Sequence, residues 1–292
     1  MRYRLEHLLF ATARVLVRLL SRRALLALGE TIGRAAFRLD RRHREVALEN
    51  LRASLPGTAP EEALRIARDS FAFFGRTLLD LVSCLPAFPP ARMAGFEHEG
   101  LEHVDTAYAS GKGVIFFTGH FGGWELMALA QGLVRRPVGV IARRLDNPHL
   151  EARLHALRTS TGNFIIEKRD GFRPMLKALR DQRGIAILID QNVIGDERVF
   201  VTFFGRPAAT TPALGLLHLK TGSPLIPVFA LPRPGDGYRF RYGPPVEVPL
   251  SGDRDEAVLR ITQACTRVLE EEIREHPSLW LWMHRRWKTQ PS

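Results

Sequence analysis

Residues 185–189 read Ile-Ala-Ile-Leu-Ile, an unbroken apolar run that ends at the polar residue Asp190. Central strands of parallel sheets have this pattern because helices cover both of their faces. Similar short apolar runs recur at 114–117, 138–142, 164–167 and 225–230, and helical stretches are expected between them at 123–133, 148–161 and 172–182. This alternation predicts an α/β fold, with a mostly parallel sheet flanked by helices.

The segments on either side of this alternation have other patterns. Residues 1–84 are predicted to be helical, and Thr58-Ala59-Pro60-Glu61 resembles a capping box at the start of one helix. Residues 238–248 alternate in polarity and contain Pro244 and Pro245, which favours a strand at the edge of the sheet. A final helix is expected at about 253–275, and it is followed by an aromatic and basic tail.

These patterns divide the chain into an amino-terminal segment and one larger domain. We expect a basic amphipathic segment at 1–40 and an α/β domain at 41–292. The domain consists of a helical cap at 41–90, a core at 95–250 and the final helix with its tail at 253–292. A length of 292 residues is compatible with either one α/β domain or two smaller domains.

The composition is that of a globular protein with an unevenly distributed positive charge. Hydrophobic residues make up 45% of the chain and charged residues 25%, which excludes a disordered tail and a polytopic membrane protein. The formal net charge is +11, and the first 44 residues carry +8 of it, from eleven arginines against Glu6, Glu30 and Asp40. Such a surplus suggests an acidic partner, which could be a nucleic acid, an anionic membrane or an acidic carrier protein.

The location of the charge favours a membrane over a nucleic acid. Arg14, Arg18 and Arg22 are spaced four residues apart within a leucine-rich stretch, so they line one face of a helix. Arginines within the apolar run argue against a membrane-spanning helix and against a secretory signal. A helix in the membrane interface and an amphipathic helix packed on the protein's own core both fit the pattern. The chain has no recognisable nucleic-acid-binding motif.

The strongest candidate for chemistry is the stretch from Gly119 to Glu125, which follows the apolar run 114–117. In open α/β sheets, ligands bind beyond the carboxyl ends of the strands. His120 lies in the expected turn and Glu125 in the first turn of the next helix, so the two side chains can approach each other. Gly122 and Gly123 permit a sharp turn and a close approach of substrate to the backbone. Free amide groups at the helix start could stabilise an oxyanion.

Two further strand ends carry polar residues. Arg143 and Asn147 follow the run 138–142, and an arginine there can bind a phosphate or a thioester oxygen, or form a surface ion pair. Asp190 and Gln191 follow the run 185–189 and suit the positioning of a substrate. The aromatic run Val199-Phe200-Val201-Thr202-Phe203-Phe204-Gly205 could line an acyl channel or belong to the core.

Several other chemistries lack their motifs. The sequence has no Gly-x-Ser-x-Gly elbow, no phosphate-binding loop and no His-Glu-x-x-His. His98 and His103 lie among glutamates, but without further paired ligands they are interpreted as part of a solvated segment, and no metal site is expected. Cys84 and Cys265 cannot form a disulfide framework, and both are predicted to be buried apolar residues.

Taken in order, these motifs resemble the lysophospholipid acyltransferase superfamily, and within it the lipid A biosynthesis (lauroyl/myristoyl) acyltransferases. The resemblance covers most of residues 95–290 and rests on several ordered motifs: 119–125, Arg143 with Asp146-Asn147-Pro148, Asp190-Gln191-Asn192, 200–205 with 209–211, Pro224-Leu225-Ile226-Pro227, and the tail 281–288. It implies a glycerolipid acyltransferase-like fold. The family often has Asn at the place of Gly123 and Pro at that of Arg144, so contacts to the acceptor can differ here.

The resemblance implies transfer of an acyl chain from an acyl carrier protein, or from coenzyme A, to a hydroxyl of a membrane glycolipid. Related enzymes acylate phosphoinositol mannosides or other lipids, so the acceptor stays open. No further cofactor is implied, and the implied location is the cytoplasmic face of the bacterial inner membrane, with peripheral or monotopic attachment. The sequence does not indicate an oligomeric state.

The hypothesis for the mechanism is direct transfer without an acyl-enzyme. His120 acts as general base towards the acceptor hydroxyl, and Glu125 orients the ring and stabilises the imidazolium. Arg143 or backbone amides near Gly119 hold the oxyanion, and Gln191, Gly122 and Gly123 contact substrate. Asn147 and Asp190 either position the acceptor or have a structural role. A basic membrane-binding module without catalysis and an esterase are the alternatives, although the esterase would lack its serine motif.

Overall fold

The computed structural model describes residues 3, 6, 10, 17, 19–168, 171–195, 197–249 and 252–291. Arg14 and Arg18 of the predicted amphipathic helix therefore lie outside the described residues. Three helices precede the sheet: α2 (Arg22–Leu39), α3 (Arg41–Ser54) and α4 (Pro60–Ser83). The helix α4 begins at Pro60 behind Ala59, with no side chain capping its first turn. The predicted capping box at Thr58 is therefore wrong, because Pro60 sets the first turn without a side-chain cap.

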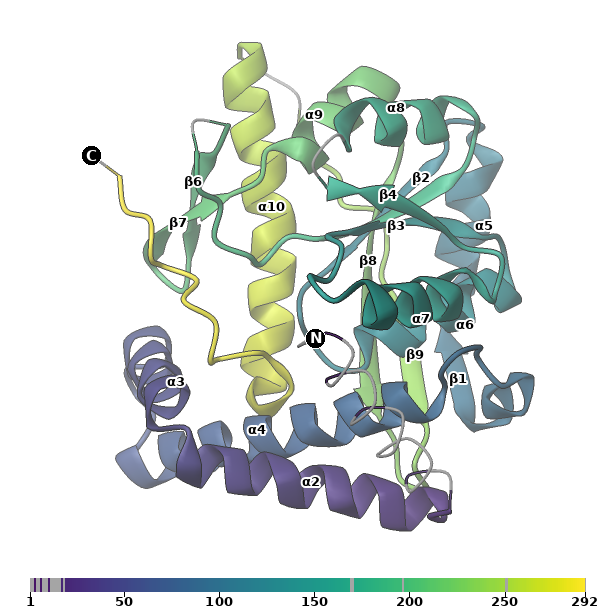
Figure 1. The fold of residues 1–292 in the computed structure, drawn as a ribbon. Coiled ribbons are helices and arrows are strands. Elements are labelled where there is room, and N and C mark those ends of the chain that lie inside the picture. Colours follow the sequence, from purple (N-terminus) through teal and green to yellow (C-terminus); the bar gives the residue numbers. More distant parts are fainter. Residues whose placement is uncertain are drawn as a thin grey trace.

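A seven-stranded sheet forms the centre of the molecule in the order β1-β9-β8-β2-β5-β3-β4 (Figure 1). Its strands are β1 (Phe96–Glu99), β2 (Val114–Thr118), β3 (Val138–Ala142), β4 (Phe164–Glu167), β5 (Gly184–Leu188), β8 (Leu225–Pro232) and β9 (Tyr238–Tyr242). All neighbouring strands pair in parallel except β8 with β9. The predicted mostly parallel α/β fold is therefore confirmed.

Helices cover both faces of this sheet. On one face lie α5 (Leu101–Ala109), α6 (Trp124–Val134) and α7 (Pro148–Thr159). On the other lie α8 (Phe172–Arg180), α9 (Ala213–Thr221) and α10 (Arg254–Glu275), with 3₁₀ turns at Pro90–Gly95 and Pro277–Leu279 (Figure 1). The chain adds β1 to β4 in one direction across the sheet and then β5 and β8 in the opposite direction. Because parallel crossovers are right-handed, the helices before β4 lie on one face and the helices after it on the other.

The predicted edge position of one strand is wrong, and one pair of strands was not predicted. The segment predicted as an edge strand is β9, which pairs with β8 on one side and with β1 on the other. Pro244 and Pro245 lie beyond the end of β9, so they do not interrupt its hydrogen bonds. The aromatic run 199–205 belongs to a separate two-stranded antiparallel sheet of β6 (Val199–Phe203) and β7 (Arg206–Thr210).

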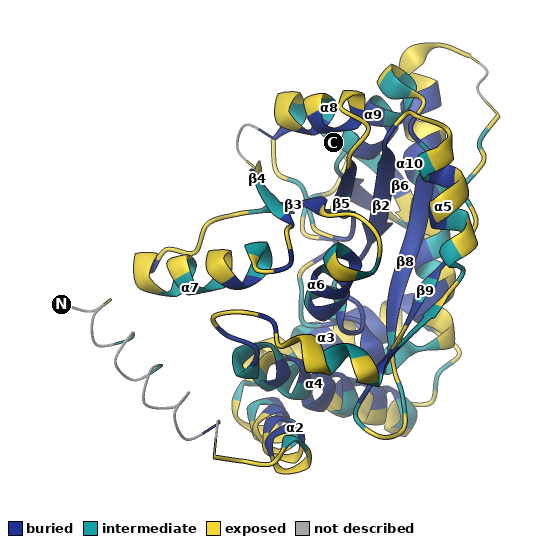
Figure 2. Cartoon of the chain, turned by 90° about the vertical axis from the view of Figure 1, so that its right-hand side faces the viewer, coloured by how far each residue is buried: buried dark blue, intermediate teal, exposed yellow. Residues whose placement is uncertain are grey.

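The core fills the space between the sheet and the helices, as the burial colours of Figure 2 show. Cys84 and Cys265 are buried, as predicted. The aromatic tail also belongs to the core: Trp280 and Trp282 are fully buried. Phe203 stacks on Trp287 with ring centroids 5.7 Å apart, so this part of the aromatic run is core.

The amino-terminal helices join the core through close backbone contact. Helices α2 and α4 pack antiparallel, and a Cβ atom added to Gly33 would lie 2.1 Å from the carbonyl oxygen of Phe71. Arg22 of α2 donates a 2.7 Å hydrogen bond to the fully buried Asp80 of α4. Burial raises the pKa of Asp80 to about 6, although Arg22 acts to lower it. None of the helices among the described residues combines the length and the apolar character that crossing a bilayer requires.

Candidate active site

The turn between β2 and α6 is fixed by contacts to the rest of the chain. The amide of Gly122 donates to the carbonyl of Leu279 at 2.9 Å, and the amide of Gly123 donates to that of Ala230 at 3.1 Å. Gly122 has a φ of +58°, and a Cβ atom there would lie 1.8 Å from the oxygen of Ala230. A Cβ atom on Gly123 would lie 2.6 Å from the ring of Tyr238.

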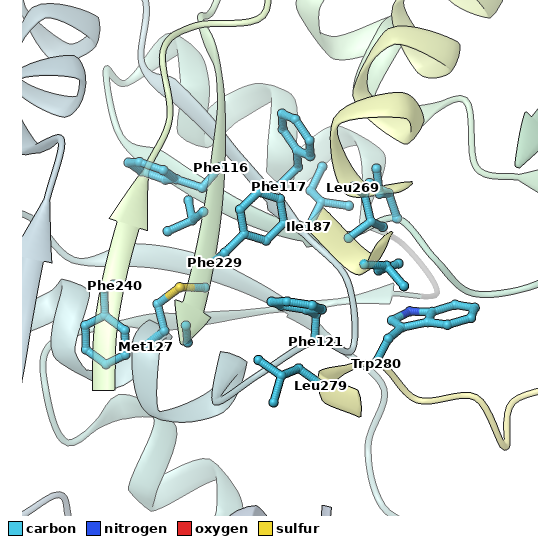
Figure 3. Close-up of a cluster of buried hydrophobic side chains, with 14 of the residues drawn as sticks. Phe116, Phe117, Phe121, Met127, Ile187, Phe229, Phe240, Leu269, Leu279 and Trp280 are labelled. Atoms are coloured by element: carbon cyan, nitrogen blue, oxygen red, sulfur yellow. The ribbon is translucent and has the colours of Figure 1, made fainter. Parts of the chain in front are cut away.

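These contacts give Gly122 and Gly123 a role in packing, and the expectation of a close approach of substrate stays a prediction. The space that a side chain would need is filled by β8 and β9, and both amides are already bonded to carbonyls. The glycines are therefore required for packing of the turn against the sheet. Figure 3 shows the apolar side of this packing, with Phe121 between Phe229 of β8 and Leu279 and Trp280 of the carboxyl-terminal segment.

The register of the sheet brings His120 and Asp190 together. Thr118 of β2 is paired with Leu188 of β5, and the pairing continues with a bond from the amide of Ile189 to the carbonyl of Thr118. His120 lies two residues after Thr118, and Asp190 lies two residues after Leu188. Nδ1 of His120 lies 2.8 Å from Oδ1 of Asp190, and the amide of His120 donates to Oδ2 at 2.7 Å.

The carboxyl-terminal segment completes the environment of Asp190. The indole Nε1 of Trp280 donates to Oδ2 of Asp190 at 2.8 Å, and the amide of Leu281 donates to the carbonyl of His120 at 3.2 Å. The Asp190 carboxylate is 3% exposed and accepts three hydrogen bonds from His120 and Trp280. The fully buried Arg286 donates to the carbonyl of Ala209 at 2.6 Å and so holds the same segment against β7.

His120 and Asp190 shift each other's pKa. Burial acts to raise the pKa of Asp190, but the positive charge and hydrogen bonds of His120 outweigh it and hold that pKa well below its usual range. Burial acts to lower the pKa of His120, yet the carboxylate of Asp190 and the charge of Glu125 raise it above its ordinary value. An ionised Asp190 requires a proton on Nδ1 of His120, so Nε2 is the nitrogen left to accept a proton.

Nε2 of His120 faces the cavity that the site adjoins. Gln191 is its nearest polar neighbour, with Nε2 of the amide 3.4 Å from Nε2 of the imidazole. The side chain of Trp124 also contacts the ring, at a centroid separation of 5.2 Å. Gln191 accepts a 3.4 Å contact from Lys168 at its Oε1. The predicted residues His120 and Gln191 therefore lie together at the cavity wall.

Glu125 lies close to His120 but is bonded elsewhere. Its carboxylate forms an ion pair with Arg158 of α7, with Nε of Arg158 donating to Oε2 at 3.1 Å. The hydrogen bond to the imidazole comes from Asp190, so the geometry places the orienting contact on Asp190. Glu125 acts on the ring through its charge, which raises the pKa of His120.

Arg143 and Asn147 occupy different surroundings. Arg143 lines the cavity, and its exposed guanidinium pairs with Asp146 at 3.1 Å. Asn147 is buried and caps α7, where its Oδ1 accepts from the amide of His149 at 3.0 Å and from that of Leu150 at 3.4 Å. The Asn147 side chain therefore starts a helix, and it is absent from the cavity lining among the described residues.

A large cavity of about 1830 Å³ opens in front of His120. Its walls come from both faces of the sheet, with mainly apolar side chains from the strands and helices. Basic side chains outnumber acidic ones in its lining, with Arg143, Arg158, Lys168, Arg173, Arg198, Lys220 and Arg254 against Glu125, Glu197 and Asp255. Within the described ranges, no group of three or more His, Cys, Asp or Glu side chains is arranged to hold a metal ion. The cavity suits a long apolar ligand with an anionic end.

Sequence reasoning did not identify Arg158 or Trp280 as site residues. Arg158 lies within a helix without any local motif, and only the fold of α7 over α6 brings it to Glu125. Trp280 belongs to the aromatic and basic tail that follows the final helix. Its ring is part of the core, and its Nε1 is bonded to Asp190. A buried tryptophan needs a hydrogen-bond partner for its N–H, and this requirement could have indicated that Trp280 contacts a polar residue such as Asp190.

Comparison with known proteins matches residues 1–289 to the sequence profile of the bacterial lipid A biosynthesis acyltransferases. The lipid A biosynthesis lauroyltransferase of Escherichia coli K12 is 27% identical over 267 residues, which cover 90% of this chain and 85% of that protein. A phosphatidylinositol mannoside acyltransferase of Mycobacterium tuberculosis (strain CDC 1551 / Oshkosh) is 27% identical over 279 residues, again covering 90% and 85%.

Proposed function

Because the chain belongs to the bacterial lipid A biosynthesis acyltransferase family and is a lipid acyltransferase, we propose that it acylates a hydroxyl of a membrane glycolipid, a lipid A precursor. The donor is a fatty acyl thioester of acyl carrier protein or of coenzyme A. The observation that carries this proposal is the imidazole of His120, held by Asp190 at Nδ1 and open to a large apolar cavity at Nε2.

The proposed reaction is a direct displacement. Nε2 of His120 takes the proton of the acceptor hydroxyl as its oxygen attacks the thioester carbonyl. The C–O bond forms, the C–S bond breaks, and the leaving thiolate receives the proton from the imidazolium. Asp190 orients the ring and stabilises the imidazolium, and the charge of Glu125 adds to that stabilisation.

The oxyanion requires donors near the carbonyl. The amides of Gly122 and Gly123 are bonded within the chain, which leaves the first turn of α6 and the guanidinium of Arg143 as the proposed donors. Among the described residues no side chain caps the start of α6, and the amides at a helix start favour negative charge. Gln191 lies beside Nε2 of His120 and would contact the acceptor hydroxyl.

The proposed location is the cytoplasmic face of the bacterial inner membrane. Helix α2 exposes an apolar stripe that includes Leu28, Ile32 and Leu39, whose exposed fractions are 39%, 49% and 82%. These positions share one face of the helix, and the exposed Arg38 lies about 100° around the helix from it. Apolar side chains beside arginines fit the interface of an anionic bilayer.

Flotation with vesicles tests this attachment. The protein is expected to float with vesicles that contain anionic lipid and less with neutral ones. A double substitution, Ile32→Asn with Leu39→Asn, should reduce flotation, whereas Leu64→Asn on the exposed face of α4 serves as a matched control. Equal flotation of all three proteins would contradict attachment through α2.

A transfer assay tests the reaction and its acceptor. The protein is incubated with a labelled acyl carrier protein thioester or acyl-coenzyme A and a total lipid extract, and new lipids are identified by mass spectrometry. Labelled glycolipid supports the proposal, and labelled phosphoinositol mannoside would support the second candidate acceptor, which the mycobacterial relative favours. Free fatty acid alone would indicate a hydrolase, and no turnover would indicate a binding module.

A further inference from the structure

The cavity extends from His120 into a lobe between α6 and the sheet. We call this space the α6 lobe and define it by its lining residues Phe116, Met127, Gln131, Val138, Val228 and Tyr242. Phe116 and Phe117 are neighbours on β2 and point to opposite faces. Figure 3 shows Met127 and Phe240 on the side of Phe116, away from Phe117 and Ile187. The α6 lobe therefore lies on one face of the sheet only.

Two polar side chains stand at the far end of this lobe. Helix α6 and strand β9 start together, because Gly123 packs against the ring of Tyr238. Gln131 lies eight residues further along the helix and Tyr242 four residues further along the strand. At 1.5 Å per helical residue and 3.3 Å per strand residue, both positions are about 12–13 Å from that shared start. Gln131 and Tyr242 thus reach the same end of the lobe.

Neither of these side chains has a hydrogen-bond partner in the described part of the chain. Gln131 is 4% exposed, and neither atom of its amide has a hydrogen-bond partner among the described residues. Tyr242 is 2% exposed, and its hydroxyl also has no partner there. Burial raises the pKa of Tyr242, so its hydroxyl is neutral and can donate. The other side chains of the α6 lobe are apolar.

We propose that Gln131 and Tyr242 form a polar stop that limits the length of the transferred acyl chain. This inference rests on the proposed function, because it takes the α6 lobe as the site of the donor chain. A terminal methyl group pressed against the amide and the phenol would exclude water from them without replacing its hydrogen bonds. Chains that end short of Gln131 and Tyr242 leave both groups hydrated and are preferred.

The place of the polar stop relative to His120 follows from the sheet register. Tyr242 pairs with Val228, and the preceding residue Pro227 pairs with Phe117, so the backbone of Tyr242 is level with the carboxyl end of β2 and two strands away from it. A chain whose carbonyl lies near His120 therefore passes beneath α6 to reach Gln131 and Tyr242. The limit that we propose comes from polarity, which distinguishes it from a wall of large side chains.

Substitutions that keep size and remove polarity test the proposal. The kcat/KM values for dodecanoyl, tetradecanoyl and hexadecanoyl thioesters are measured for the unmodified enzyme, Gln131→Leu and Tyr242→Phe. Each variant should raise the ratio of hexadecanoyl to dodecanoyl transfer by roughly five- to tenfold, since an apolar end accepts the longer chain. Tyr238→Phe makes the same chemical change at the other end of β9, outside the cavity lining, and should leave the ratio unchanged.

The outcomes separate this inference from the proposed function. An unchanged ratio in both variants, with an active unmodified enzyme, overturns the polar stop and favours a purely steric limit. If Gln131→Leu fails to fold, which a thermal melt shows, the ratio in Tyr242→Phe decides the question. Absence of transfer with every chain in the unmodified enzyme would contradict the proposed function itself.

Discussion

Two groups of polar side chains along the same cavity are in opposite states. Beyond the carboxyl end of β2, His120, Asp190 and Trp280 are charged or polar and are bonded to one another at 2.8 Å. In the α6 lobe, Gln131 and Tyr242 are neutral and have no partner among the described residues. A fully bonded network fixes the geometry that proton transfer needs. Unbonded polar groups leave the α6 lobe able to discriminate between ligands.

The largest effect is expected from removing the base at the carboxyl end. His120→Ala should reduce kcat/KM for acyl transfer by roughly 10²- to 10⁴-fold, because His120 is the proposed general base for the acceptor hydroxyl. The control is His43→Ala, which makes the same change on the exposed surface of α3. Initial rates with a labelled thioester measure both, and near-normal turnover in His120→Ala would refute the assignment.

Neutralising the partner of His120 is expected to have the next largest effect. Asp190→Asn keeps the shape of the side chain but removes the charge that stabilises the imidazolium, so a loss of about 10²-fold or more in kcat is expected. Asp69→Asn on α4 removes a carboxylate that pairs with Arg65 on the surface and is the control. A loss in Asp190→Asn no greater than in Asp69→Asn would indicate that Asp190 has no part in catalysis.

A smaller effect should distinguish two neighbouring tryptophans. Trp280 donates to Asp190 at 2.8 Å, whereas Trp282 donates to the carbonyl of Pro277 at 2.7 Å. Replacing either by Phe removes one buried hydrogen bond and should lower the free energy of unfolding by about 1–3 kcal/mol. Only Trp280→Phe should also reduce kcat, by roughly tenfold, because the Asp190 anion loses a donor. Equal kcat values in the two variants would contradict the link from Trp280 to the site.

Much of the fold could be predicted from local patterns. The continuous run 185–189 and the similar runs correctly predicted the parallel strands, because a strand buried on both faces consists almost entirely of apolar residues. β1 is short and contains Glu97, His98 and Glu99, so it has no continuous apolar run and was not predicted. The interior position of β9 depends on β1, and an alternating pattern cannot show which strands become neighbours.

The site was predicted in part for the same reason. His120 and Asp190 were both chosen because each follows a strand, but their contact depends on β2 and β5 being paired in register, although the chain between them passes through β3 and β4. Spacing in the sequence favoured Glu125 as the partner of His120, and the structure bonds Glu125 to Arg158 instead. The packing role of Gly122 and Gly123 follows from β8 and β9, which are more than a hundred residues away.

The coupling of His120 to Asp190 is tested most directly by the pH dependence of kcat/KM in the unmodified enzyme and in Asp190→Asn. The Asp190 carboxylate raises the pKa of His120, so the neutral base is lost as the pH falls through that raised value. Activity should therefore decline on the acid side in the unmodified enzyme, and the decline should move to lower pH in Asp190→Asn. A decline at the same pH in both proteins would contradict the account.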